Sequence, residues 1–268
     1  MEEHRQQNIR TRRHSIWRYS REGLFQQESD VLISEFAATI YLNGRELVTL
    51  LCTPEYLEDL AVGFLAVEGL LAQPEDLEQV VADYQRGQIW VRSSKAPLAT
   101  EPNFLKRCLT TGCGKGSAFI KLDEVKELTP LAQTLQVTPP QINSLMGELR
   151  DRSELFRATG GSHSAALCSS DTFILYREDL GRHNAVDKII GRCWRRNINP
   201  KQYFLLTSCR ISAEILLKAA RMGIEIVISR AAPTSLAVNI AAQLGVTVVG
   251  FARGGSFNLY TYPERVKI

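Results

Sequence analysis

The stretch FLLTSCRISAEILLKAARMGIEIVISRAAPTSLAVNIAAQLGVTVVG, residues 204–250, decides the fold expected for this 268-residue chain. Short apolar runs typical of buried strands alternate in it with longer segments of helical period. The second helical segment has Pro233 at its start and Gly245 just past its end, which are the positions that these residues favour. Strands that alternate with helices in this way predict an α/β structure with a mostly parallel sheet that helices cover.

The same alternation begins upstream, after Gly160-Gly161. Residues 162–179 are expected to form two strands and residues 183–196 a helix. A segment rich in proline and threonine precedes them, and Pro139-Pro140 predicts the start of a helix that runs to Thr159. We therefore divide the chain into a basic N-terminal tail (1–25), an α+β N-terminal domain (26–137) and an α/β domain (138–268).

The first half of the chain has the pattern of an α+β structure. Residues 31–52 predict two strands, because Asn43-Gly44 favours the positive φ angles of a type I′ hairpin turn. Thr53-Pro54 predicts an N-cap and the first residue of a helix with one apolar face. Glu68 continues that face, and it is either a carboxylate at an exposed helix end or a group placed for function. A second hairpin is expected around Arg86-Gly87.

Composition predicts a soluble protein and excludes several classes. The net charge of +3 is too small to argue for binding to nucleic acid or to an anionic membrane. The polar N-terminus lacks the apolar core of a secretory signal, and the longest apolar stretch, 61–72, is too short to cross a bilayer. None of the six cysteines forms a C-x-x-C pair, so we expect no metal site. These features favour a cytoplasmic protein with reduced thiols.

The loop TTGCGKGS (110–117) holds the strongest candidate for chemistry, the thiol of Cys113. The glycines around it leave the backbone N–H groups free to converge on an anion such as a thiolate. Lys115 adds positive charge, and Ser117 is suited to cap a helix whose N-terminus would further favour the thiolate. The alternative is a turn that contains a cysteine by chance.

A second group of polar residues stands where the predicted strands end. REDLGRHNAVDK (177–188) contains Arg182 and His183, TSCRISAE (207–214) contains Arg210, and GFARGG (250–255) contains Arg253. Ligands of parallel sheets bind at the carboxyl ends of strands, and arginine pairs well with phosphate. The convergence indicates a nucleotide-like anion, although each segment alone is also compatible with a salt-bridged or glycine turn. His163, on a predicted strand, fits a structural role better than a catalytic one.

These motifs, in this order, resemble the formate dehydrogenase accessory sulfurtransferase family (FdhD/NarQ). The resemblance runs from around Asp30 to Tyr260. It includes LNG (42–44), TPEYLEDLAVGFLAVEGLL (53–71), the cysteine loop, TGGSHSAAL (159–167), REDLGRHNAVDKIIG (177–191), SCRISAEILLKAA (208–220), APTSLAVNIAAQLGVTVVGFARGG (232–255) and NLY (258–260).

The resemblance implies a homodimer with a cytidine-deaminase-like, three-layer second domain. It implies a sulfurtransferase in which a cysteine desulfurase loads a persulfide on Cys113. The sulfur would then pass to the bis(molybdopterin guanine dinucleotide) molybdenum cofactor, bound as a substrate, for use in formate dehydrogenase. The residues that the resemblance assigns to cofactor recognition are Phe251, Ala252, Arg253, Gly254, Gly255 and Ser256, and the strand-end argument adds Arg182, His183 and Arg210.

The cysteine loop departs from the family pattern. Many relatives carry a C-G-x-C-G pair, whereas this chain has only CGKG, so Cys113 matches either the first or the second cysteine of the pair. A persulfide needs only one sulfur carrier, so a relay is compatible with this loop. A resolving thiol would come from the acceptor or from Cys108. The choice of desulfurase, of formate dehydrogenase, and of molybdenum or tungsten stays open.

Two other functional classes were compared with the relay. A zinc deaminase is excluded, because Ser164 and Ala165 follow His163 where H-x-E is needed, and the chain has no P-C-x-x-C. A non-catalytic chaperone that binds the cofactor and hands it to formate dehydrogenase is the remaining alternative. In that case the arginines at the strand ends would matter and Cys113 would be expendable.

Overall fold

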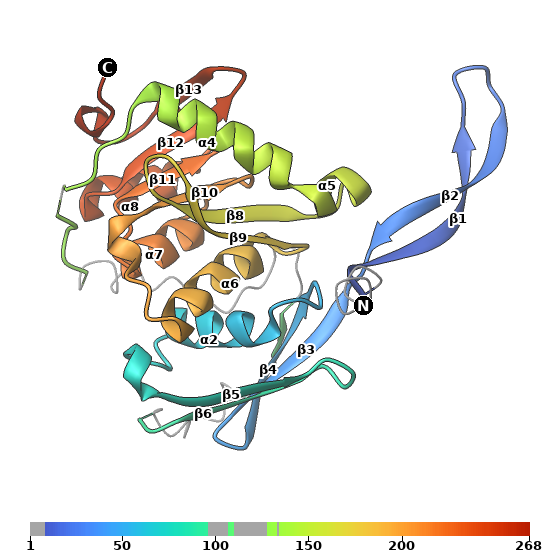
Figure 1. Cartoon of the computed structure of the whole chain (residues 1–268), viewed down its shortest axis with the longest axis horizontal. Coiled ribbons are helices and arrows are strands. Elements are labelled where there is room, and N and C mark those ends of the chain that lie inside the picture. Colours follow the sequence, from blue (N-terminus) through green and yellow to red (C-terminus); the bar gives the residue numbers. More distant parts are fainter. Residues whose placement is uncertain (1–8, 96–106, 110–127, 133) are drawn as a thin grey trace.

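The computed structural model describes residues 9–95, 107–109, 128–132 and 134–268. These residues form three sheets with helices between and around them (Figure 1). Helix α2 lies between a five-stranded sheet from the first half of the chain and helix α6 of the second half, and a long hairpin projects away from both. No helix in the described ranges is both long and apolar enough to span a bilayer.

The larger sheet has six strands in the order β13-β12-β11-β10-β8-β9. Its strands are β8 (His163–Cys168), β9 (Phe173–Asp179), β10 (Phe204–Thr207), β11 (Ile226–Ser229), β12 (Thr247–Arg253) and β13 (Ser256–Leu259). The prediction of a mostly parallel sheet is wrong, because only the β10–β11 and β11–β12 pairings are parallel and the other three are antiparallel. Strands β8 and β9, and likewise β12 and β13, are joined by short turns, and a parallel pairing needs a crossover of a dozen or more residues.

Helices cover both faces of this sheet. Helix α4 (Pro139–Arg152) packs on one face, whereas α6 (Arg182–Arg195), α7 (Ala213–Arg221) and α8 (Ser235–Leu244) pack on the other. Strands in this layer are buried on both sides, so neighbours such as Leu205 and Leu206 belong to different core clusters. The predicted helix from Pro139 to Thr159 breaks at Ser153, after which α5 (Glu154–Thr159) begins. Thr138 caps α4 in a capping box with Gln141.

The smaller sheet has five strands in the order β5-β6-β3-β4-β7. They are β3 (Phe36–Leu42), β4 (Arg45–Cys52), β5 (Leu77–Asp83), β6 (Gln88–Ser93) and β7 (Arg107–Leu109). The predicted turn at Asn43-Gly44 is confirmed, since both residues have positive φ, 49° and 80°. The hairpin around Arg86-Gly87 is confirmed as well. Helix α2 (Leu57–Val67) packs its apolar side chains on one face of this sheet.

The predicted helix start at Thr53-Pro54 is wrong, because α2 begins at Leu57. Tyr56 occupies the N-cap position with a left-handed φ of 53°, and its side chain supplies no cap. The Thr53 hydroxyl accepts a hydrogen bond from the N–H of Leu180, which follows β9 of the larger sheet, instead of capping α2. A contact to a residue 127 positions away is invisible to a local capping pattern.

The two halves meet where α2 crosses α6 without side chains between the backbones. A Cβ atom added to Gly63 would lie 1.9 Å from the carbonyl oxygen of Asp187, and one added to Gly191 would lie 1.8 Å from that of Asp59. Asp59 on α2 is buried and binds Arg177 on β9, at 3.0 Å, and Arg195 on α6. Close helix contact and these ion pairs hold the smaller sheet against the larger domain.

The prediction of a basic tail over residues 1–25 is wrong for residues 9–25, which are the part of that segment that the structure describes. Strand β1 (Thr11–Tyr19) pairs antiparallel with β2 (Phe25–Ile33) over nine residue pairs, forming a hairpin that we call the arm. Alternating side chains, and the turn closed by the hydrogen bond from the N–H of Gly23 to the carbonyl of Ser20, favour this hairpin over a helix. The arm crosses the boundary that we expected at residue 25.

Candidate functional site

Asp179 is the centre of the predicted polar cluster, and its role is structural. Its carboxylate is fully buried and accepts hydrogen bonds from the N–H of Thr53 at 3.0 Å and from the side chain of Asn184 at 2.9 Å. The Nζ atom of Lys188 lies 2.6 Å from the same carboxylate and donates also to the carbonyl of Thr53. These four residues join the end of β9 to the end of β4. We call Thr53, Asp179, Asn184 and Lys188 the frame of the site.

Other members of the 177–188 cluster are also used by the fold. Glu178 accepts hydrogen bonds from the N–H groups of Leu155 and Phe156 and so caps α5. Asp187 forms a buried pair with Lys218 of α7 at 2.6 Å. The residues of this cluster that stay partly exposed at the start of α6 are Arg182 and His183. Most polar side chains of the segment 177–188 are therefore used by the fold.

Strand directions bring the predicted site residues to one edge of the larger sheet. Strands β9, β10, β11 and β12 run the same way, and β8 begins at the edge where they end. His163, the first residue of β8, lies opposite Asp179, the last residue of β9. This edge carries His163, Arg182, His183, Arg210, Arg230 and residues 251–256. The N-termini of α6 and α7 lie at the same edge and favour an anion there.

The edge is long, and its predicted residues form two groups. Arg182 follows β9 and Arg253 ends β12, and in the strand order these two strands are four spacings apart. At about 4.8 Å for each spacing, the two groups are separated by about 19 Å along the edge. Arg210 follows β10 and lies between them. A ligand that touches both groups would have to be extended.

His183 is held as a neutral imidazole at the first end of this edge. Burial, together with the nearby charges of Lys218 and Arg182, lowers the pKa of His183 to about 3. Its Nε2 atom lies 3.4 Å from Oε2 of Glu214, in the first turn of α7. The pKa of His163 is also lowered, first by burial and then by Arg182. Arg182 therefore lies close to both imidazoles and supplies the fixed positive charge of this end.

The turn from β12 to β13 forms the second end. Phe251 has a left-handed φ of 54° at a β-bulge, an unusual conformation for a bulky residue that points to a local constraint. Its ring is partly exposed, and the guanidinium carbon of Arg253 lies 5.8 Å from the ring centre. Gly254 and Gly255, with φ of 63° and 82°, supply the tight turn to β13. Ala252 points into the core, so only its backbone faces the edge.

Comparison with known proteins places the chain in a family. The sequence model of the FdhD/NarQ family matches residues 33–267. The chain belongs to the FdhD/NarQ family. A protein named sulfur carrier protein FdhD from Bacillus subtilis (strain 168) is 39% identical over 252 residues, which are 94% of this chain and 96% of the relative. A protein of the same name from Bacillus pumilus (strain SAFR-032) is 41% identical over 92% of this chain and 94% of its own length.

A crystal structure shares the fold. It comes from Desulfotalea psychrophila and is proposed to be a formate dehydrogenase accessory protein. It is 26% identical, with a TM-score of 0.79, and the match covers 96% of this chain and 99% of the other. The resemblance that the motifs indicated is therefore confirmed, whereas the binding role of each residue at the sheet edge stays a prediction.

The described thiols of this FdhD/NarQ protein are poor nucleophiles. Cys52, Cys168, Cys193 and Cys209 are free and buried. Burial raises the pKa of each, to about 12 for Cys193. Cys113, the predicted persulfide carrier, lies outside the described residues, and Cys108 is described only as part of the β7 backbone. Among the described thiols, none has the exposure that a sulfur carrier needs.

Strand β7 shows where the chain enters the cysteine loop. It pairs in parallel with β4, and Leu109 lies beside Leu50. Strand β4 continues to Thr53, whose N–H and hydroxyl bind Asp179 and Leu180. The end of β7 thus points toward the start of α6, where Arg182 and His183 lie.

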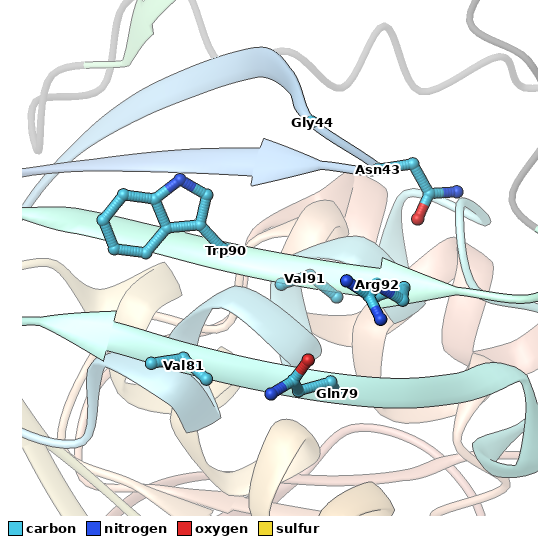
Figure 2. A pocket seen from close by; sticks show the side chains of 7 residues that line it. All are labelled: Asn43, Gly44, Gln79, Val81, Trp90, Val91 and Arg92. Atoms are coloured by element: carbon cyan, nitrogen blue, oxygen red, sulfur yellow. The ribbon is translucent and has the colours of Figure 1, made fainter.

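A hollow lies away from this edge, on the outer face of the smaller sheet. Its lining residues are Asn43, Gly44, Gln79, Val81, Trp90, Val91 and Arg92, and its volume is about 560 Å³ (Figure 2). Trp90 stacks on Tyr41 with ring centres 5.9 Å apart. None of the predicted site residues lines it. Sequence reasoning also missed Glu214, whose contact with His183 joins two helices and leaves no local signal.

Proposed function

We propose that this protein carries persulfide sulfur on Cys113 from a cysteine desulfurase to the bis(molybdopterin guanine dinucleotide) molybdenum cofactor, which formate dehydrogenase needs. Membership of the FdhD/NarQ family and relatives named sulfur carrier protein FdhD support the sulfur-carrier part. The D. psychrophila structure supports a link to formate dehydrogenase. The transfer to this cofactor, the desulfurase and the enzymatic status are our proposals.

The observation that carries the proposal is the register of β7 against β4. Cys113 lies four residues after Leu109, and a four-residue segment spans at most about 14 Å. The chain enters the loop beside the frame formed by Thr53 and Asp179, next to Arg182. This arrangement supports a thiol that acts within reach of the cationic edge.

Loading of Cys113 is a thiol exchange. The Cys113 thiolate attacks the outer sulfur of the donor's persulfide, a new S–S bond forms, and the donor cysteine leaves as a thiolate. Lys115 and the glycine N–H groups in the loop would favour the thiolate, because they offer positive charge and hydrogen bonds. The buried thiols described above would not compete.

The sheet edge suits an extended anionic substrate. Arg182 and Arg210 would bind phosphates near the loop, and Phe251, Arg253 and the Gly254–Gly255 turn would contact the guanine end. The separation of about 19 Å between the two ends fits a dinucleotide-containing cofactor better than a mononucleotide. The pair of neutral imidazoles, His163 and His183, offers hydrogen bonds without adding charge.

The finer structural expectations are also proposals. We infer a cytidine-deaminase-like arrangement for residues 138–268, supported by a mixed sheet with helices on both faces. Residues 26–137 would form the domain that carries the cysteine loop. A homodimer in the cytoplasm is proposed from the family resemblance.

The deciding experiment is complementation of cells that lack the native protein. Cys113→Ala should leave formate dehydrogenase inactive, whereas the matched control Cys209→Ala, which also removes a thiol, should restore activity. Incubation with a desulfurase and cysteine should add one sulfur to Cys113, detectable by mass spectrometry. Full activity with Cys113→Ala would reject the relay and favour the cofactor chaperone.

Binding of a guanine nucleotide tests the cofactor-binding part of the proposal separately from the sulfur-carrier part. Cys113→Ala should bind GDP as the wild type does, whereas Arg253→Ala should bind it at least about 10-fold more weakly. Lys267→Ala, at an exposed site away from the edge, is the control. Equal GDP affinity for the wild type and Arg253→Ala would contradict the assignment of residues 251–256.

A further inference from the structure

Arg230 lies on the sheet edge between the two groups of predicted site residues. It directly follows β11, and β11 stands between β10 and β12 in the strand order (Figure 1). Arg210 follows β10 and Phe251 lies on β12, so Arg230 has one of these residues on either side. A ligand that extends from the segment 251–256 toward Arg182 would have to pass Arg230.

The turn that contains Arg230 is fixed to the end of β10. The N–H of Arg230 donates a hydrogen bond to the carbonyl of Thr207 at 3.1 Å. The hydroxyl of Ser229 is fully buried, donates to the carbonyl of Cys209 and accepts from the N–H of Ala231 at 3.0 Å. These bonds tie the backbone on both sides of Arg230, so its position on the edge is set by the fold.

The same turn is in close contact with β12. The N–H of Phe251 donates to the carbonyl of Ala231 at 3.1 Å. A Cβ atom added to Gly250 would lie 2.9 Å from Cδ of Pro233 and 3.3 Å from the carbonyl oxygen of Ala231. Glycine at position 250 therefore allows β12 to approach the turn, and Arg230 is held beside Phe251 at neighbouring strand ends.

The charge around Arg230 suits an anion. Arg230 is exposed and forms no ion pair with any residue that the structure describes. Between Glu225 and Glu264 the sequence contains no aspartate or glutamate, so no carboxylate from β11, α8, β12 or β13 competes for the guanidinium. Glu214, at the start of α7, faces His183 instead. An exposed arginine in such surroundings is suited to pair with a phosphate through two parallel hydrogen bonds.

The neighbours of Phe251 give a bound nucleotide a direction. A guanine base that stacks on the partly exposed ring of Phe251 leaves its phosphates to extend to one side. On one side lies β13 (Ser256–Leu259), which has no cationic residue, and on the other lies Arg230. Arg253 lies on β12 itself, with its guanidinium carbon 5.8 Å from the ring centre of Phe251, and so stays near the base.

We propose that Arg230 binds the diphosphate next to the guanosine and so sets the direction of the cofactor along the sheet edge. This inference rests on the proposed function, in which residues 251–256 contact the guanine end. From Arg230 the edge continues through Arg210 to Arg182, which lies near the entry of the cysteine loop. The rest of the cofactor then extends toward Cys113, and Arg230 favours a nucleoside diphosphate over the nucleoside alone.

Isothermal titration of the full chain with GDP and with guanosine tests the phosphate contact. Arg230→Ala should weaken GDP binding at least about 10-fold and guanosine binding less than about twofold. Arg230→Lys keeps the charge without the paired donors and should recover part of the GDP affinity. The matched control Arg196→Ala removes an exposed arginine beyond the end of α6, away from this edge, and should bind both probes as the wild type does. Circular dichroism checks that each variant is folded.

The variant Arg253→Ala separates this inference from the proposed function. If Arg253→Ala weakens GDP binding and Arg230→Ala does not, the guanine assignment stands and the role of Arg230 is rejected. Equal losses of GDP and guanosine affinity in Arg230→Ala would also reject it, because the side chain would then act through the shape of the turn. A wild type that binds neither probe would overturn both the inference and the cofactor-binding part of the proposed function.

Discussion

The Nζ atom of Lys188 lies 2.6 Å from the carboxylate of Asp179, and both side chains are fully buried. Each group also contacts the backbone of Thr53, which belongs to the other half of the chain. A buried ion pair satisfied in this way costs little as long as both partners stay, but either one alone is strongly unfavourable. The pair therefore couples the frame of the sheet edge to the fold of the smaller sheet.

Lys188→Met should destabilise the protein by about 3–5 kcal/mol, because it leaves the Asp179 carboxylate buried without its counter-charge. Urea unfolding measures the difference. Lys267→Met, at an exposed site, should stay within about 0.5 kcal/mol of the wild type. The double variant Asp179→Asn/Lys188→Met should recover part of the loss, and a double variant no more stable than Lys188→Met would argue against the buried charge as the cause.

Gly191→Ala should destabilise the protein by about 2 kcal/mol or more, because the new Cβ would overlap the backbone of α2. Gly147, on a half-buried part of α4, has no atom within 4 Å of an added Cβ. Gly147→Ala should therefore stabilise the protein by up to about 1 kcal/mol, through helix propensity alone. Thermal unfolding of the two variants compares them directly, and equal effects would contradict the close helix contact.

Acid should destabilise the protein in part through His183. Its folded pKa is about 3, whereas an unfolded imidazole titrates near 6.5, so the unfolded state binds the proton first. The stability from this group is complete above pH 6.5 and is lost as the pH falls toward 3. His183→Gln should lose about 2 kcal/mol less than the wild type between pH 7 and pH 4.5.

The control for that titration is His14→Gln, which removes an exposed imidazole on the arm. Its stability should fall with pH as in the wild type. Parallel curves for the wild type and His183→Gln, measured by urea unfolding at each pH, would show that His183 is not held neutral by its surroundings.

Alkylation of the native protein should separate the thiols. At neutral pH, Cys52, Cys168, Cys193 and Cys209 should react with iodoacetamide at least about 100-fold more slowly than in urea, since burial raises the pKa of each thiol and blocks access. Cys113 should react first. Mass spectrometry of peptides after short reaction times measures the order, and early labelling of Cys209 would contradict its buried position.

Local sequence patterns predict an element of this protein correctly where the residues that form the element are neighbours in the sequence. Asn43-Gly44 predicted its turn because both residues tolerate positive φ, and Pro139-Pro140 predicted the start of α4 because proline is favoured in the first turn of a helix. The family could also be identified from motifs in order, and the comparisons agree with it. Buried strands and helices of 204–250 were expected in nearly their observed places.

Long-range contacts account for the expectations that were wrong. Thr53 was expected to cap α2. Its N–H instead donates to Asp179 and its hydroxyl accepts from Leu180, at the end of β9. Strands β9 and β13 pair antiparallel with β8 and β12, because the short turns that join them leave no room for crossovers. Asp179, Asn184 and Lys188 belong to the polar segment 177–188, and a local sequence does not show that these side chains face other buried groups and not a ligand.

The sequence by itself determined the family, most of the secondary structure and the set of thiols and arginines from which a site can be built. Only the tertiary structure decided which of them lie together. Parallel strand directions bring Arg182, Arg210 and Arg253 to one sheet edge, and the pairing of β7 with β4 brings the entry of the cysteine loop to the same place. Burial then removes four cysteines from consideration and leaves Cys108 and Cys113 as the thiols to test, because a thiolate needs solvent or charge that a packed core does not supply.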